Sequence, residues 1–365
     1  MLPALLTAAA IAVVPDAAIH HYAMKGAPFG VVASHDSRHL FVTVAAGEKG
    51  LAAYDIGDGG LVRSGFVALD GLPADFALTP DEGLAVVASG AHVYFVDTAK
   101  LLAGGQDAVL GHMELSQTSV NAAVSPDGRF AFVAEEGDGV ITVVDLDKIR
   151  VGSIGTSAVI GRINVGLSPI AIVFSKDGQW IYVSVEAAAD GLNWPNACDD
   201  ETGRGAPHAQ GAVITLKAAA AEAGAGRAVV GIAAAGCEAV RLRLSDDGAK
   251  AYVTARGSGE VVVLDTASLP GKLSRVAGMT APVGPSPVGI TGDGKRLFIA
   301  LSNRFKQARG ASSVVVVDPQ TLAVTGSIPA GVFPREVTIT PDHHWLFISN
   351  FGSNDLEQVD LKTVP

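Results

Sequence analysis

The stretch SDDGAKAYVTARGSGEVVVLDTA, residues 245–267, contains the pattern on which the fold depends. A Ser-x-Asp turn is followed by an apolar strand, a Gly-bearing turn and a second strand that ends in Asp. Two further stretches have the same frame, namely SPDGRFAFVAEEGDGVITVVDLD (125–147) and TPDHHWLFISNFGSNDLEQVDLKT (340–363). Repetition of this kind indicates an array of similar structural units.

The frame recurs around seven aspartates, at intervals of 45, 46, 50, 70, 46 and 49 residues. These aspartates are Asp36, Asp81, Asp127, Asp177, Asp247, Asp293 and Asp342. The residues eight positions earlier are mostly prolines, and they are Pro28, Pro73, Ser119, Pro169, Ala239, Pro285 and Pro334. Short alternating strands repeated every roughly 40–50 residues predict an all-β fold, a seven-bladed β-propeller of four-stranded antiparallel blades.

The two ends of the chain indicate how such a ring would close. The last repeat stops after its third strand, whereas residues 18–24, AIHHYAM, precede the first repeat and have strand character. We expect them to complete the last blade as its outer strand, which removes an open sheet edge. Residues 18–365 then form one domain.

Composition and the N-terminus limit the partners and the compartment. A net charge of -11 lacks the basic surface that phosphate binding needs, so nucleic acid is not expected as a partner. Residues 1–17 begin with the uncharged run MLPALLTAAAIAVV, which resembles the apolar core of a secretory signal peptide, although its usual positive n-region is missing. We expect a periplasmic or secreted protein without a transmembrane segment in the mature chain. The alternative is a cytoplasmic protein with an apolar extension.

The segments AYVTARGSGEVVVLD (251–265) and IYVSV (181–185) resemble the YVTN-type propeller repeat, and the likeness extends over nearly the whole chain. Relatives with this repeat include periplasmic and surface binding proteins, lactonase-type enzymes, and haem- or quinone-associated propeller domains. The resemblance implies an architecture and says little about chemistry, because one fold serves many functions.

A ligand site is expected on one face of the disc. The starts of the first strands and the ends of the second strands share that face, and their polar residues gather at the mouth of the central channel. Aligned on the turn aspartates, the expected ligand-binding residues are Asp75, Asn121, Glu135, Glu136, Glu186, Arg241, Arg256, Asn303, Arg304 and Asn350. The alternative is that they are solvated strand ends and ion pairs between blades.

The segment PREVT (334–338) supplies two candidate catalytic residues, Arg335 and Glu336. The guanidinium offers a planar fork for a carboxylate or oxyanion, and the carboxylate could exchange a proton. Lactonase-type propellers carry a similar Pro-Arg in their last repeat. They also carry Pro-Arg-His in the fifth, where this chain reads Ala239-Val240-Arg241, so the His that would serve as acid or base is missing.

The 70-residue interval marks an insertion in the fourth repeat, a loop over residues 187–210 on the same face. Its Cys198 and the nearby Cys237 come from adjacent blades, which favours a disulfide. Two free thiols, or metal ligation by a cysteine with His208 or Asp199, are the alternatives. Trp194 and His208 are the loop side chains best suited to touch a ligand. No CxxCH, G-x-S-x-G or zinc spacing is present, so no cofactor or metal is expected.

Three functions remain open from the sequence. The first is an exported, monomeric, non-catalytic propeller that binds a small polar or anionic ligand, or a protein partner, on the loop-bearing face. The second is a lactonase-like hydrolase, or a lyase or isomerase, acting on a small carboxylate or lactone. The third is a propeller that docks a redox enzyme or haem protein.

Overall fold

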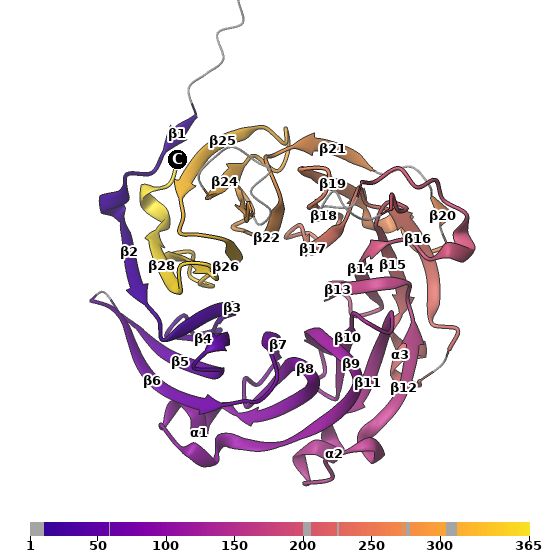
Figure 1. Ribbon diagram of the computed structural model, residues 1–365, viewed down its shortest axis with the longest axis horizontal. Helices are drawn as coiled ribbons and strands as arrows, with labels where there is room; N and C mark the ends of the chain where they lie inside the picture. Colours follow the sequence, from indigo (N-terminus) through magenta and orange to yellow (C-terminus); the bar gives the residue numbers. More distant parts are fainter. Residues whose placement is uncertain are drawn as a thin grey trace, which may run out of the picture.

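The computed structural model describes residues 11–57, 59–199, 206–224, 226–271, 273–274, 278–303 and 312–365. In these ranges the chain forms β-sheets arranged as a ring, which confirms an all-β, propeller-like fold (Figure 1). Three short α-helices lie on the outer side of the ring: α1 (Thr98–Leu102), α2 (Leu146–Arg150) and α3 (Ala218–Glu222). No helix in the described ranges is long and apolar enough to cross a membrane.

The described strands form six sheets. The first, in hydrogen-bonded order, holds β3 (Gly26–Ala33), β4 (His39–Gly47), β5 (Gly50–Gly57) and β6 (Gly60–Ala68). The second has six strands, β7 (Pro73–Leu78), β8 (Leu84–Asp97), β9 (Val109–Val124), β10 (Phe130–Glu135), β11 (Val140–Asp145) and β12 (Val159–Asn164). The third contains β13 (Leu167–Phe174), β14 (Trp180–Ala187), β15 (Ala212–Lys217), β16 (Val229–Ala234) and β20 (Leu273–Ser274).

The remaining three sheets follow along the ring. They contain, first, β17 (Ala239–Leu244), β18 (Lys250–Ala255), β19 (Glu260–Asp265) and β21 (Met279–Pro282). Next come β22 (Pro287–Gly292), β23 (Leu297–Leu301), β24 (Ser313–Val317) and β25 (Val324–Pro329), with β1 (Ala12–Val13) at the outer edge. The last holds β26 (Pro334–Ile339), β27 (Trp345–Asn350), β28 (Asp355–Asp360) and β2 (Ile19–Ala23).

The repeated Ser/Thr-x-Asp motif forms the turn between two consecutive antiparallel strands of a sheet. In one copy, Ser245 Oγ donates to Asp247 Oδ1 at 2.5 Å, and the same oxygen accepts the Ala249 N–H at 3.0 Å. The hydrogen bond from Ser245 is the main cause that lowers the pKa of Asp247. The same pattern occurs at Asp36, Asp81, Asp127, Asp177 and Asp342. The aspartates recur because each one closes such a turn through its side chain.

The first strands have a bulge close to the proline or small residue that begins them. The ladder shifts register between Pro169 and Ala171, between Pro334 and Glu336, and at the matching points of β3, β7, β17 and β22. A bulge removes a backbone N–H from the ladder, so that group needs another acceptor.

In four sheets a hydroxyl on the second strand accepts this N–H. Thr254 Oγ1 accepts the Arg241 N–H at 3.0 Å and donates to the Val288 carbonyl of the next sheet at 2.9 Å. We call this contact a hydroxyl bridge, and its four members are Thr43, Ser184, Thr254 and Ser349. Each occupies the Thr or Ser position of the YVT-like segment, so the motif residue connects neighbouring sheets.

Apolar side chains fill the layers between neighbouring sheets. One cluster joins Phe132 and Ile141 of the second sheet to Ile181, Val183 and residues around them in the third. Another joins the sheets of β22–β25 and β26–β28 and includes Ile19 of β2. The core is therefore a series of contacts between sheets, and the spacing between sheets determines how well each layer packs.

The N-terminal strand pairs with the last strand of the chain. β2 runs antiparallel to β28, with His21 opposite Glu357 and Ala23 opposite Asp355. Segments more than three hundred residues apart in sequence thus belong to one sheet (Figure 1).

The hydroxyl bridge predicts opposite outcomes for two buried threonines. Thr254→Val leaves the Arg241 N–H and the Val288 carbonyl without their partner, so we expect the free energy of unfolding to fall by about 1–3 kcal/mol. Thr215 is equally buried, but its hydroxyl has no hydrogen-bond partner among the described residues. Thr215→Val should therefore be neutral or stabilising. Urea unfolding of both variants tests this, and equal losses would contradict the bridge.

Candidate functional site

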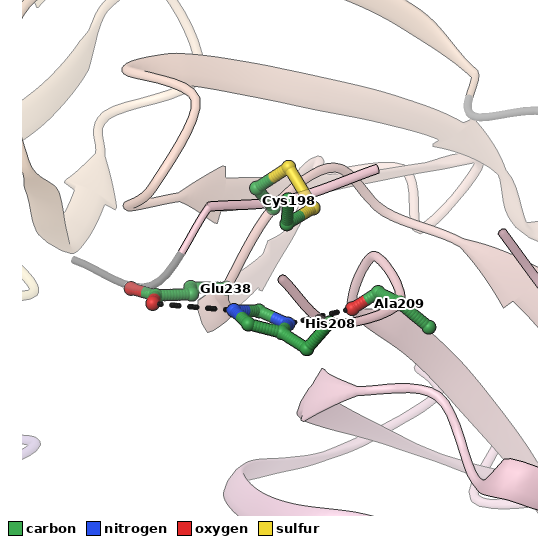
Figure 2. Close-up of a disulfide and its surroundings, with 5 residues drawn as sticks. Cys198, His208, Ala209 and Glu238 are labelled. Atoms are coloured by element: carbon green, nitrogen blue, oxygen red, sulfur yellow. Dashed lines mark hydrogen bonds and ion pairs between the residues drawn. A yellow bond between two sulfur atoms is a disulfide. The ribbon is translucent and has the colours of Figure 1, made fainter. Parts of the chain in front are cut away.

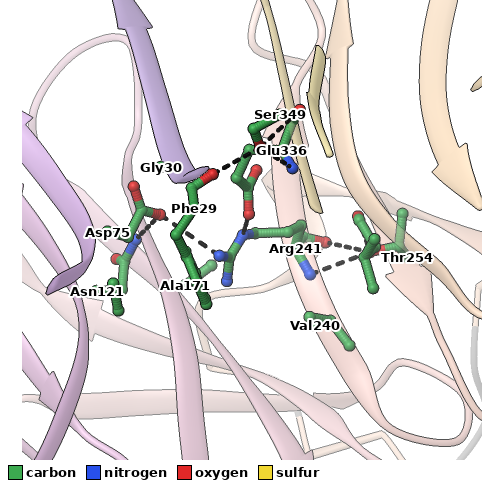
Figure 3. Close-up of polar contacts among 12 residues, drawn as sticks. Phe29, Gly30, Asp75, Asn121, Ala171, Val240, Arg241, Thr254, Glu336 and Ser349 are labelled. Atoms are coloured by element: carbon green, nitrogen blue, oxygen red, sulfur yellow. Dashed lines mark hydrogen bonds and ion pairs between the residues drawn. The ribbon is translucent and has the colours of Figure 1, made fainter. Parts of the chain in front are cut away.

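Four of the expected site residues meet at the axis of the ring, and we call them the axial network: Asp75, Asn121, Arg241 and Glu336. Arg241 of β17 bonds through Nε to Glu336 Oε1 of β26, and its Nη2 lies 3.5 Å from Asp75 Oδ2 of β7. Asn121 of β9 donates from Nδ2 to Asp75 Oδ2 at 2.8 Å (Figure 3). Three first strands and β9 thus supply one connected polar cluster.

The bulges explain why these residues face the axis. Each lies two positions after the proline or small residue that begins the repeat, beside the register shift. The backbone N–H groups of Arg241 and Glu336 are held by hydroxyl bridges at 3.0 Å, which leaves their side chains to meet across the ring.

The axial network holds two carboxylates against one buried guanidinium. The side chains of Arg241, Glu336 and Asp75 are only 8%, 13% and 15% exposed. Burial, reinforced by the neighbouring Asp75, raises the pKa of Glu336 to about 7 although Arg241 opposes the change. Near neutral pH, Glu336 therefore both accepts and releases a proton.

Arg335, the other candidate catalytic residue, stacks on aromatic rings, and its positive charge also opposes the rise in the pKa of Glu336. Its guanidinium carbon lies 4.3 Å from the ring centroid of Phe29 and 5.4 Å from that of Phe333. Stacking on aromatic rings orients the planar fork of an arginine.

The loop over residues 187–210 is tied to the next sheet by the expected disulfide. Cys198 and Cys237 are bonded, with Cα atoms 5.5 Å apart, so both the free thiols and the metal-ligating cysteine are excluded (Figure 2). Cys198 also exchanges two backbone hydrogen bonds with His208, at 3.0 and 2.9 Å. A cross-link closing a loop of this size stabilises the fold by roughly 3–4 kcal/mol in the chain-entropy model.

A second polar cluster lies beneath this disulfide. Arg256 Nη2 contacts Glu186 Oε1 at 2.9 Å and Glu238 Oε2 at 3.1 Å. His208 Nε2 lies 3.7 Å from Glu238 Oε1, and its Nδ1 is 2.8 Å from the Ala209 carbonyl (Figure 2). Three expected site residues, Glu186, His208 and Arg256, are thus assembled around Glu238, which the sequence reasoning missed. The sequence feature that could have pointed to Glu238 is its position next to Cys237.

Other expected residues lie elsewhere. Glu135 has a fully buried side chain that bonds Arg162 of β12 at 2.9 Å, which is an ion pair within one sheet and not the pair between blades of the alternative expectation. Trp194, expected to touch a ligand, is only 6% exposed and packs in an apolar cluster with Ile214 and its neighbours. Its large ring is covered because the loop folds down onto the sheet. Arg304 lies outside the described residues.

Two open pockets occur beside the strand ends of this face. One of about 460 Å³ is lined by Glu136, Asn164 and Ser168 among others. One of about 630 Å³ is lined by Asn303, Asp355, Glu357 and the backbone around Gly331. Asn350 is buried and donates to Asp355 Oδ2 at 3.1 Å.

The larger pocket also contains a group that the sequence reasoning missed. His21, Asp355 and Glu357 offer ligand atoms that lie within 4.8 Å of one another. Side chains alternate between the two faces of a strand, so the pairing of β2 with β28 places His21, Asp355 and Glu357 on one face. This pattern could have revealed the cluster from the sequence.

No family model matches the chain, and no curated protein matches it. Among solved structures, the chain is similar to a chain of Kuenenia stuttgartiensis hydrazine synthase, with a TM-score of 0.69 and 18% sequence identity. The match covers 92% of this chain and 96% of that chain. At this identity the similarity concerns the fold alone, and that neighbour is a β-propeller protein.

The pKa of Glu336 predicts a pH dependence of stability. Because its pKa rises from 4.5 to about 7 on folding, the native state binds a proton that the unfolded state releases in that range. The free energy of unfolding should therefore fall between pH 4.5 and 7, by up to about 3 kcal/mol from this group. Urea unfolding across this pH range should show that the free energy of unfolding falls less steeply with pH in Glu336→Gln than in the wild type. Some slope remains, because the pKa of Glu357 is also about 7.

A matched variant controls for the loss of a carboxylate as such. Glu114 is exposed on β9, and Glu114→Gln should keep the wild-type slope. An unchanged slope in Glu336→Gln would contradict the assignment.

Proposed function

We propose that the ring consists of seven blades of the YVTN type, closed by β2. Supporting this, the six-stranded sheet contains β8 and β9, of 14 and 16 residues, which are each about twice the usual strand length. Counting each as two segments gives two four-stranded blades. The pairing of β2 with β28 supports the closure.

The protein is proposed to be exported. The disulfide between Cys198 and Cys237 supports this, because such bonds persist in oxidising compartments and are rare in the cytosol.

Its proposed function is non-catalytic binding of a small carboxylate-bearing ligand on the loop-bearing face. The observation that carries this proposal is the axial network, in which Arg241, Glu336 and Asp75 engage one another. In a hydrolase, charged side chains of this kind would point at the substrate. In the axial network they pair with one another. Arg335 is the proposed ligand contact, since its guanidinium is oriented by Phe29 and Phe333 and a carboxylate suits its fork.

A second candidate is a lactonase-like hydrolase, or a lyase or isomerase, of small oxygenated acids. The pKa of Glu336, raised to about 7 by burial, favours it, because a general acid or base works best when its pKa is near the working pH. Arg241 and Arg335 would then stabilise the developing negative charge.

Calorimetric titration with a panel of mono-, di- and tricarboxylates distinguishes the two. Arg335→Ala should weaken a bound carboxylate about 10–100-fold, as for a lost charged hydrogen bond. Arg63→Ala is the matched control, because Arg63 also lies over a phenylalanine ring, at 4.4 Å from that of Phe66, but on the outer strand β6.

The same protein is assayed on a panel of lactones. Turnover that Arg335→Ala abolishes would contradict the binding proposal and support the second candidate. If the protein neither binds a carboxylate of the first panel nor turns over a lactone of the second, both candidate functions are contradicted.

A further inference from the structure

Three side chains that could hold a metal ion gather where the first and last strands meet. His21 Nδ1 lies 3.6 Å from Glu357 Oε1 and 3.8 Å from Asp355 Oδ2. Antiparallel pairing places His21 directly opposite Glu357, and Asp355 lies two residues before Glu357 on β28. Since alternate residues of a strand share a face, all three side chains point to one side of this sheet.

Contacts outside the cluster orient each of these groups. The Gly331 N–H donates to Glu357 Oε1 at 2.8 Å, and Asn350 Nδ2 donates to Asp355 Oδ2 at 3.1 Å. Asp16 Oδ1 lies 3.6 Å from His21 Nε2, which leaves Nδ1 facing the two carboxylates. In metal sites a carboxylate commonly accepts the N–H of the ring nitrogen that does not bind the metal, and Asp16 would have to approach closer than 3.6 Å to do so.

The cluster leaves polar atoms unsatisfied. The Glu357 side chain is 1% exposed, and among the described residues neither its Oε2 nor Asn350 Oδ1 has a partner within hydrogen-bond geometry, although the Asn350 amide lies close enough to favour the charged form of Glu357. Of the described residues, His21 is the one basic group within ion-pair distance of Glu357. A buried carboxylate beside a second carboxylate is costly unless a cation compensates it.

We propose that His21 Nδ1, Asp355 and Glu357 bind a divalent transition-metal ion of the Zn²⁺ type. Tetrahedral Zn²⁺, with ligands at about 2.0–2.2 Å, separates its ligand atoms by roughly 3.3–3.6 Å, close to the 3.6 and 3.8 Å that separate His21 Nδ1 from the two carboxylates. An imidazole nitrogen in the set favours such an ion over Ca²⁺ or Mg²⁺, which prefer oxygen ligands. The remaining coordination position faces the pocket of about 630 Å³, which these residues line.

The ion would connect the first strand of the sheet to the last. A ligand that binds the native state and not the unfolded state raises its stability, so Zn²⁺ should raise the melting temperature of the chain. This inference does not depend on the proposed carboxylate ligand, which is placed at Arg335.

The test is calorimetric titration of ZnCl₂ into tag-free, chelator-treated full-length protein. A second group, His92, His112 and Glu114, also lies within 4.8 Å, so every measurement uses a His112→Ala background. We expect one bound Zn²⁺ per chain and a raised melting temperature. His21→Ala and Glu357→Gln should each weaken binding at least tenfold, whereas His20→Ala, exposed beside His21 on β2, should not.

His21 is half-exposed, so His21→Ala is expected to keep the fold even if Glu357→Gln does not. Equal melting temperatures of His21→Ala and its parent in excess chelator verify this. Absence of Zn²⁺ binding, binding that His21→Ala leaves unchanged, or equal affinity for Ca²⁺ would each overturn the proposal.

Discussion

In each bridged sheet, one Ser or Thr hydroxyl makes the hydrogen bonds that connect this sheet to the next. A serine or threonine on the second strand accepts the N–H that a bulge removes from the ladder, and donates to a carbonyl of the neighbouring first strand. Both partners are buried, so the bridge fixes the bulge and the distance between sheets together. The apolar layers between sheets can pack closely only at that distance.

The same constraint determines what lies at the axis. Hydroxyls of the second strands hold the backbone N–H groups of Arg241 and Glu336 at the bulges. The two side chains therefore point toward the axis, where they meet Asp75 of another first strand. The resulting cluster has more carboxylate than guanidinium, and the pKa of Glu336 reflects that imbalance and its burial. Fold and candidate site thus share one set of backbone contacts.

Much of this could be predicted from sequence because it repeats. The Ser/Thr-x-Asp turns and the all-β fold were expected correctly, and so was the disulfide, since topology brought Cys198 and Cys237 to one face. Side-chain partners were harder to predict. Glu135 pairs with Arg162 across strands, and Trp194 is covered by its own loop, and neither outcome follows from a position in the repeat. Glu238 and the His21 cluster depend on contacts between segments that the repeat alignment treats separately.

Hydrogen exchange of individual backbone amides, measured by NMR, tests the hydroxyl bridge most directly. The amides of Ala171, Arg241 and Glu336 lie at bulges, where they have no partner in the ladder. If hydroxyls hold them, they should exchange as slowly as amides in the middle of the second strands, through global unfolding. Exchange as fast as that of exposed turn amides would contradict the account.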